Sequence, residues 1–347
     1  MEITYNDLLL VTGATGLVGS HVVRHAHERR IRTRVLVRQS SDTGLLDEWG
    51  VEQIVGDMTD CESLKRAVDG SSVIVHCAAK VGDWGRVDDY RTINVRGLEN
   101  LLEGIEAAGS VKRFIQISSL GVYEARDHFG TDETEQPTAN GIDGYTLTKV
   151  ESEQLVVRRI RETKLPATIL RPGFIYGPRD RTVLPRLLKK LKEGRFAFLG
   201  SGETLMNNTY VGNLVDAIFA AVERDVSIGQ TYNITDGWIV SKKEFITTIA
   251  QLAGYPIPTR KVPLPLARIL ASVLEKTWHL LGKQEAPLLS QARIKFLGLN
   301  LDFCIDKARR ELEYHPQVEF ADGMRQTIDW FREQGMIERL KHRTSGS

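Results

Sequence analysis

The sequence has few cysteines, no long apolar run and no excess of charge of either sign. Its three cysteines, Cys61, Cys77 and Cys304, show no C-x-x-C spacing, and an odd number cannot all pair within one chain. We therefore expect reduced thiols, a cytoplasmic protein and no metal site. No apolar run reaches the 18 or more residues that a membrane-spanning helix needs. The first residues lack the basic-then-apolar layout of a signal peptide.

The charges of the chain nearly cancel, with 46 basic and 45 acidic residues among 347. This total favours neither nucleic acid nor an anionic membrane as the main partner. The length allows a large core, in one domain or in two unequal ones.

A glycine-rich stretch at residues 8–19 organises the rest of the chain. The apolar run Leu8–Val11 stops at Gly13, further glycines follow at 16 and 19, and a helical pattern extends over 17–28. A strand that feeds a helix through such a turn leaves the helix N-terminus open for a phosphate. The spacing is G-x-x-G-x-x-G rather than G-x-G-x-x-G, and an ordinary strand-to-helix turn is the alternative.

Apolar runs alternate with helical patterns over the first half of the chain. Strands are expected at 34–37, 52–55, 73–79, 114–119 and 167–171, and helices at 45–49, 61–68, 88–108 and 145–162. This alternation predicts an α/β protein with a doubly wound parallel sheet. We expect a dinucleotide-binding domain over 1–175, a mainly substrate-binding region over 176–335 from which strands such as 230–234 return to the first sheet, and a tail over 336–347.

Ligands of such a sheet bind where its strands end. The residues at the expected strand ends should therefore converge on one crevice: Gly13, Arg38, Asp57, Ala78 and Ser119.

Tyr145 and Lys149 lie four residues apart and share one face of an expected helix. A phenol has a pKa near 10, and a nearby ammonium favours the phenolate. The pair therefore suits proton transfer near neutral pH, although Y-x-x-x-K also arises by chance. Ser119 could hydrogen-bond a substrate carbonyl oxygen, and Asn94 could hold a water or backbone group that orients Lys149. Without a catalytic role, Ser119 would be an ordinary turn residue and Asn94 an ordinary polar residue of a helix.

The combination of these motifs resembles the extended short-chain dehydrogenase/reductases, with a Rossmann-type fold. The resemblance covers residues 8 to about 335 and is carried by 12–19, Asp57, 76–79, Asn94, 118–119, Tyr145, Lys149, 171–178, 208–217 and 232–237. The loop 80–85 and the stretch 171–178 are most similar to the 3β-hydroxysteroid dehydrogenase branch, near the dihydroflavonol reductases.

The resemblance implies an NAD(P)-dependent oxidoreductase that interconverts a secondary alcohol and a ketone on a sterol-like, β-keto acid or flavonoid-like substrate. Tyr145 would be the general acid/base, Lys149 its activator, Ser119 the carbonyl orienter and Asn94 a supporting residue. The cofactor would lie against Gly13, Thr15, Gly16, Leu17, Val18, Gly19, Arg38, Asp57, Met58, Ala78, Ala79, Lys80, Ser118, Tyr145, Lys149, Pro172, Gly173, Phe174 and Ile175.

The end of the second strand bears on the choice of cofactor. Arg38 stands where NAD-binding sheets carry an acid, and Ser40 and Ser41 could also donate to a phosphate. An arginine there accommodates the 2′-phosphate of NADP. We therefore expect NADP(H), with NAD(H) as the alternative if Asp42 folds back toward the ribose.

Residues 262–281 carry apolar side chains at helical spacing, interrupted by charges. This segment is a helix packed on the core, a lid over an apolar substrate, or a surface that contacts lipid. Trp84 should face the same crevice.

Two alternatives to a ketone reductase remain. A nucleotide-sugar epimerase or dehydratase with retained NAD would use Arg179, Arg181 and Arg186 for a pyrophosphate, and a dinucleotide-binding scaffold would lack turnover. By analogy alone, the helices at 88–108 and 145–162 suggest a homodimer.

Overall fold

The computed structural model describes residues 3–4, 6–138, 143–283 and 285–338. The expected tail over 336–347 therefore lies largely outside the described residues. At its centre is a seven-stranded sheet in the order β11-β7-β5-β4-β1-β2-β3, in which every neighbouring pair is parallel. The doubly wound parallel sheet expected from the sequence is confirmed.

The sheet strands are short and mostly apolar, as strands covered on both faces must be. They are β1 (Leu8–Thr12), β2 (Arg32–Val37), β3 (Glu52–Val55), β4 (Val73–His76), β5 (Arg113–Ile117), β7 (Ala167–Pro172) and β11 (Thr231–Ile234). The order reverses between β1 and β4, so the ligand-binding point of such sheets falls between these two strands.

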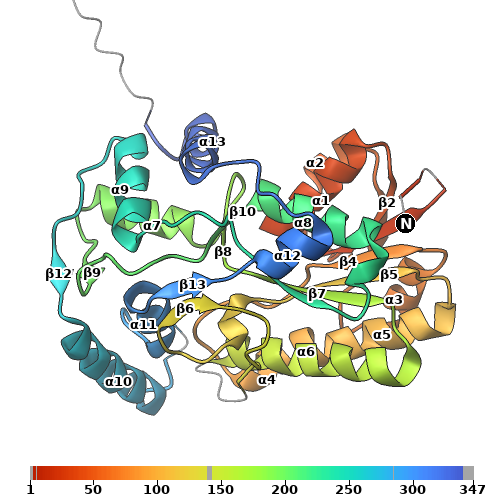
Figure 1. Ribbon diagram of the computed structural model, residues 1–347, viewed down its shortest axis with the longest axis horizontal. Helices are drawn as coiled ribbons and strands as arrows, with labels where there is room; N and C mark the ends of the chain where they lie inside the picture. Colours follow the sequence, from red (N-terminus) through yellow and green to blue (C-terminus); the bar gives the residue numbers. More distant parts are fainter. Residues whose placement is uncertain (1–2, 5, 139–142, 284, 339–347) are drawn as a thin grey trace, which may run out of the picture.

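Helices cover both faces of the sheet, which forms the middle of three layers (Figure 1). One layer holds α1 (Leu17–Glu28), α2 (Gly44–Glu48), α8 (Val211–Glu223) and α12 (Asp306–Leu312). The other holds α3 (Cys61–Val68), α4 (Val87–Arg91), α5 (Gly97–Ala108) and α6 (Gly144–Thr163). Each layer buries its own apolar cluster against the sheet, Val22 and Ile218 on one side and Leu64 and Leu101 on the other.

The second half of the chain forms a less regular body beside the strand ends. It contains α7 (Leu184–Lys192), α9 (Lys242–Ala253), α10 (Leu264–Leu280), α11 (Gln291–Gly298) and α13 (Phe320–Glu333). Two two-stranded parallel pairs join this body to the first half: β8 (Phe174–Tyr176) with β10 (Asn208–Tyr210), and β6 (His128–Thr131) with β13 (Leu301–Phe303). A third pair, β9 (Phe198–Leu199) with β12 (Lys261–Val262), lies within the body.

The helix expected over 88–108 is not continuous. The structure has α4, then a π-helical turn over Thr92–Arg96, then α5. A π-helical turn holds one extra residue per turn and is frequent at functional sites. It lies where Asn94 turns its side chain into the protein. Among the described residues, no helix is long and apolar enough to cross a membrane.

Candidate active site

The glycine turn after β1 leaves the N-terminus of α1 open. Gly13 has a positive φ of 70°, and a Cβ there would lie 2.7 Å from the backbone nitrogen of Ala78. A Cβ on Gly19 would lie 2.3 Å from the carbonyl oxygen of Gly13, so this glycine lets the helix approach the turn. Gly16 is exposed at the N-cap and no side chain caps the helix. The first-turn N–H groups can therefore receive an anion.

The ends of β1 and β4 are tied together beside this turn. The Oγ1 atom of Thr12 lies 2.7 Å from Nδ1 of His76 and accepts a hydrogen bond from the backbone N–H of Ala78 at 3.3 Å. Burial lowers the pKa of His76 to about 3, and the charge of Lys149 adds to this effect. His76 is therefore neutral at physiological pH and holds the strand ends in place.

Asn94 joins the loop after β4 to helix α6. Its Oδ1 accepts from the backbone N–H of Lys80 at 2.7 Å, while its Nδ2 donates to the carbonyl of Lys80 at 3.1 Å and to Oγ1 of Thr148 at 2.9 Å. The side chain is buried. Asn94 thus bonds to Thr148, the residue before Lys149, and to the backbone of Lys80. Within the described ranges it makes no hydrogen bond with Lys149 itself.

Ser119, Tyr145 and Lys149 come together at the end of β5. Tyr145 is hydrogen-bonded to Ser119, and Nζ of Lys149 lies 5.8 Å from the centre of the Tyr145 ring. Nζ of Lys149 also donates to the carbonyl of Ile117 at 2.7 Å. Asp143 caps α6 by accepting from the N–H of Thr146 at 2.8 Å, which fixes the turn that carries Tyr145.

The protonation of this group differs from the sequence argument, which expects a lowered pKa for the phenol. Burial, together with the charge of Asp143, raises the pKa of Tyr145 to about 12, although the hydrogen bond with Ser119 opposes the increase. Burial also lowers the pKa of Lys149 to about 8. The sequence argument did not include the carboxylate of Asp143, which lies two residues before Tyr145. The residues of the chain therefore hold Tyr145 as a neutral phenol, a proton donor.

Ser118 points away from this group. It is buried, and its hydroxyl donates to Oε1 of Glu153. Glu153 in turn forms a bidentate ion pair with Arg171, with Oε2 and Nη2 2.6 Å apart, and Nη1 of Arg171 donates to the hydroxyl of Tyr123 at 2.7 Å. This network joins α6, β7 and the loop after β5. The hydroxyl of Ser118 thus has a partner inside the protein, and its expected place against the cofactor stays a prediction.

Lys295 of α11 was not singled out from the sequence. Its Nζ donates to the carbonyls of Gly121 at 2.8 Å and Tyr123 at 2.7 Å, in the turn that follows Ser119. Burial lowers its pKa to about 8, while the charge of Asp143 opposes that shift. Lys295 fixes the Ser119 turn from the second half of the chain, 174 residues away, so no local pattern could reveal it.

At the end of β2, Arg38 is exposed and its guanidinium makes no hydrogen bond or ion pair within the described residues. Asp42 forms an ion pair with Arg181, at 3.2 Å, rather than folding toward the strand end. Asp57, after β3, accepts from the N–H and hydroxyl of Thr59, and these bonds lower its pKa, with a smaller effect from the charge of Arg38. Arg38 and Asp57 therefore face the same strand-end region.

Two further segments of the expected cofactor site have clear structural roles. Met58 is buried, and a Cβ on Gly97 would lie 2.6 Å from its Cβ, so α5 crosses close to the loop after β3. Gly173 follows Pro172 and leaves no room for a side chain, because a Cβ would lie 1.7 Å from the carbonyl oxygen of Asn207. The remaining members stand in the turn after β1, the loop after β4 and β8: Thr15, Leu17, Val18, Ala79, Lys80, Phe174 and Ile175.

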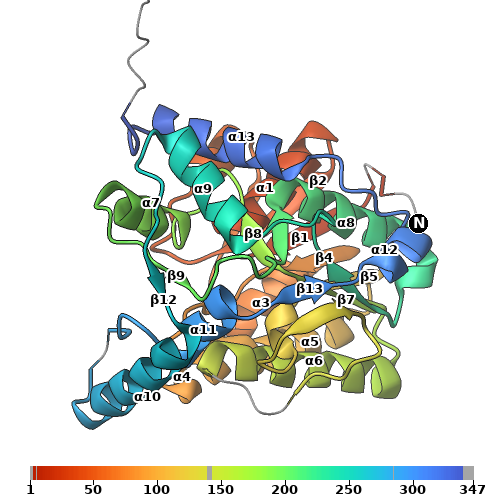
Figure 2. The ribbon, with the colours of Figure 1, turned by 60° about the vertical axis from the view of Figure 1, so that its left-hand side comes forward.

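The loop 80–85 contacts the end of α10, the turn after it and α11. Nε1 of Trp84 donates to the carbonyl of Lys283 at 3.0 Å, and its ring lies 4.5 Å from that of His279. Asp83 pairs with Arg293 of α11 at 2.7 Å. Figure 2 shows α10 and α11 next to each other at the lower left of the molecule, on the opposite side from α12.

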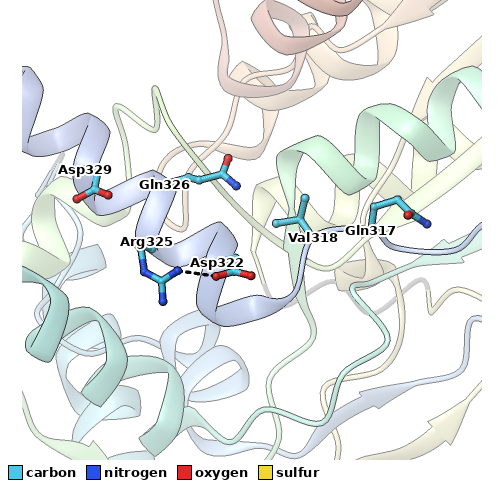
Figure 3. A pocket seen from close by; sticks show the side chains of 6 residues that line it. All are labelled: Gln317, Val318, Asp322, Arg325, Gln326 and Asp329. Carbon is cyan, nitrogen blue, oxygen red and sulfur yellow. Dashed lines mark hydrogen bonds and ion pairs between the residues drawn. The ribbon is translucent and has the colours of Figure 1, made fainter.

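A separate cavity of about 280 Å³ lies beside α13 and is lined by Gln317, Val318, Asp322, Arg325, Gln326 and Asp329 (Figure 3). Arg325 and Asp322 form an ion pair across its wall. None of the residues that the sequence assigns to catalysis or to the cofactor lines this cavity, so it is not part of the candidate site.

Residues 9–235 match the NAD dependent epimerase/dehydratase family. The chain belongs to this family. It is therefore an enzyme of an NAD-dependent family, and the resemblance to the extended short-chain dehydrogenase/reductases is confirmed.

Among members of the epimerase/dehydratase family, the chain is 30% identical over 326 residues to the 2-alkyl-3-oxoalkanoate reductase of Stenotrophomonas maltophilia (strain K279a), covering 91% of this chain and 97% of the relative. It is 28% identical to the 3beta-hydroxysteroid-dehydrogenase/decarboxylase isoform 1 of Arabidopsis thaliana, covering 95% and 81%. The crystal structure of gox2253 has a TM-score of 0.82 at 32% identity, covering 96% of this chain and all of that one. UDP-glucose 4-epimerase of Thermotoga maritima, with a TM-score of 0.74 at 23% identity, shows the shared fold.

Proposed function

We propose that the protein is an NAD(P)H-dependent oxidoreductase that interconverts a ketone and a secondary alcohol on an apolar substrate. The observation that carries this proposal is the hydrogen-bonded Ser119 and Tyr145 with Lys149 close by, next to an open helix N-terminus. The names of its relatives support the substrate class, since they are a 3-oxoalkanoate reductase and hydroxysteroid dehydrogenases.

In this mechanism, the nicotinamide cofactor supplies the hydride when it is bound. Ser119 donates a hydrogen bond to the carbonyl oxygen of the ketone. Tyr145, a neutral phenol in this environment, gives its proton to the same oxygen. Lys149, which Ile117 holds through its backbone carbonyl, stabilises the resulting phenolate with its positive charge.

The residues of the chain fit a dinucleotide at this place. Gly13 and Gly19 keep the turn free of side chains, and the uncapped first turn of α1 suits the pyrophosphate. Asp57 would accept from the adenine ring, and Asn94 would keep Lys80 and Thr148 in place beside the nicotinamide half.

We propose NADP(H) as the preferred cofactor. Arg38 keeps its guanidinium free of partners among the described residues, which suits a 2′-phosphate. The acid that would argue for NAD, Asp42, is paired with Arg181 instead.

The region 176–335 would bind the substrate. Its contribution near the Ser119 turn is apolar, since Phe296, next to Lys295 of α11, packs on Phe174 with ring centres 4.8 Å apart, and both rings are partly exposed. Such walls favour sterol-like, acyl or flavonoid-like ketones over sugars.

The positions of the arginines weigh against the epimerase alternative. Arg179 lies over the ring of Trp49 at 5.2 Å, and Arg181 pairs with Asp42, so both are used beside α2. Arg186 is exposed on α7. An enzyme for a nucleotide sugar would need such cations at the substrate diphosphate.

The test is a fluorescence titration of the purified protein with NADPH and NADH, followed by turnover with a panel of apolar ketones and with UDP-glucose. We expect tighter binding of NADPH, and oxidation of NADPH by apolar ketones. Tyr145→Phe should retain NADPH binding and lose about 10²-fold or more of kcat, while Arg38→Gln should weaken NADPH and leave NADH binding unchanged. Retained NAD without net turnover, together with interconversion of UDP-glucose, would refute the proposal.

A homodimer through α5 and α6 is the expected assembly, by analogy with the family fold. Sedimentation of the full chain tests it, and a mass near 39.0 kDa would contradict it.

A further inference from the structure

Helix α10 carries its large apolar side chains on the outside. Leu266, Ile269, Leu270, Val273 and Leu280 share one face, which we call the α10 face, because pairs among them are three, four or seven residues apart. Their exposed fractions range from 44% to 87%. The residues of α10 that are buried are the small Ala267 and Ala271. This is the reverse of an ordinary surface helix, whose large apolar side chains face the core.

A contiguous exposed apolar face of this kind is typical of an interaction site. In Figure 2 the helix lies at the edge of the molecule, with one side toward α11 and the other toward the outside. Leu281 and Leu288, which follow in the chain, are also exposed and extend the apolar surface.

The charge around the α10 face is mainly positive. Residues 260–283 contain five basic residues and one acidic residue, a net charge of +4, whereas the whole chain has +1. The basic residues are Arg260, Lys261, Arg268, Lys276 and Lys283. None of them forms an ion pair with another residue in the described ranges, and the single acid, Glu275, accepts from the N–H of Gln291 at 2.8 Å. The balanced total of the chain hides this local excess.

We propose that α10 docks on the surface of a bilayer that carries anionic headgroups. Helices with an apolar face and basic flanks lie in the plane of the interface, with the apolar face at the level of the upper acyl chains. The basic residues then meet phosphate groups. A second copy of the chain is a less suitable partner for the α10 face. A two-fold axis there would bring two segments together that each have a net charge of +4, and these would repel each other.

Docking through α10 would bring the candidate active site close to the lipid. Trp84 contacts α10 and the following turn, and its carbonyl accepts from the hydroxyl of Tyr90 at 2.7 Å. Tyr90 packs against Gly144, the residue before Tyr145, so closely that a Cβ there would lie 2.6 Å from its ring. An apolar ketone could thus enter from the bilayer; this consequence rests on the proposed function, whereas the docking itself does not.

The test is sedimentation of the full chain with vesicles of phosphatidylcholine, with and without phosphatidylglycerol. We expect binding to the anionic vesicles, and weaker binding in high salt. The paired variant Ile269→Glu and Val273→Glu should reduce the bound fraction about tenfold or more, since it puts charges into the apolar face. The matched control is Ile239→Glu, at a side chain that is 80% exposed outside α10, and it should bind like the unaltered protein. Circular dichroism confirms that both variants are folded.

Three outcomes would overturn the proposal. The unaltered protein could stay in the supernatant with anionic vesicles at low salt. The α10 variant could bind as well as the control, which would place the lipid contact elsewhere. The α10 variant could lower the mass of the protein in solution without vesicles, which would make the face a contact between copies. Because no turnover is measured, a failure of the proposed reaction would leave this result unaffected.

Discussion

The buried ion pair between Glu153 and Arg171 gives the sharpest prediction for stability. The two side chains are 4% and 6% exposed. They meet through three contacts, with Nε 2.9 Å from Oε1 and 3.2 Å from Oε2, and Nη2 2.6 Å from Oε2. In Glu153→Gln the guanidinium would stay buried and charged, facing one amide oxygen and an NH₂ group. Removing one partner of such a pair costs about 3–5 kcal/mol.

For a chain of this size, that loss should lower the melting temperature by roughly 5 °C or more. The matched control is Glu106→Gln, which breaks the ion pair with Arg159 between α5 and α6. That pair is at 3.1 Å, and its side chains are 29% and 18% exposed. Because water can replace the lost partner there, we expect a cost of no more than about 1 kcal/mol.

Thermal melts followed by circular dichroism, together with urea unfolding, measure both variants. The paired variant Glu153→Met with Arg171→Met provides a second check, since it removes both charges and should be less destabilised than Glu153→Gln. The reasoning would be refuted if Glu153→Gln were no less stable than Glu106→Gln, or if the paired variant were the least stable of all.

Three further predictions concern close backbone contacts and protonation. Gly173→Ala should destabilise the protein by about 2 kcal/mol or more in urea unfolding, because its Cβ would overlap the carbonyl of Asn207. Gly104→Ala, whose Cβ would have its nearest contact at 3.9 Å, should instead stabilise α5 by about 0.5–1 kcal/mol. Equal effects of the two variants on stability would contradict this prediction. Asn94→Ala removes three hydrogen bonds and should weaken NADPH binding in a fluorescence titration. The control Asn100→Ala loses one hydrogen bond to Met58 and should bind NADPH like the unaltered protein. Equal affinities of the two variants would count against a positioning role for Asn94. Because burial lowers the pKa of Lys149 to about 8, the side chain loses its positive charge above that pH. The kcat for ketone reduction should therefore fall as the pH rises past 8. A kcat that stays constant well above that pH would remove Lys149 from the mechanism.

Local patterns predicted the first half of the fold well. The helices expected at 17–28 and 61–68 and the strand expected at 52–55 have the same bounds in the structure. Each has a clear local cause: a glycine turn before the first, and Asp60, which caps the second by accepting from the N–H groups of Glu62 and Ser63. The expected strand over 73–79 ends earlier, at His76, because Cys77 and Ala78 turn to meet Thr12.

The parts that depend on distant contacts could not be predicted. The pairs β6 with β13 and β9 with β12 bring together strands of two to four residues, too short for any periodicity. The sequence identified Ser119, Tyr145 and Lys149 as candidates, but the pKa of Tyr145 depends on burial and on Asp143. Likewise, the burial of Glu153 beside Arg171 and the contact of Lys295 with the Ser119 turn arise from packing across the sheet.

The two short pairs on either side of α10 and α11 have a consequence for the evolution of the protein. Residues 261–262 are held by β9, and residues 301–303 are held by β6, so both ends of the intervening segment have fixed positions. Changes of length and sequence between these anchors leave the register of the central sheet untouched. We therefore expect the segment 263–300 to be exchangeable for that of a relative, provided that the lysine at 295, which holds the Ser119 turn, is kept; a chimaera should then fold and take on the relative's substrate preference.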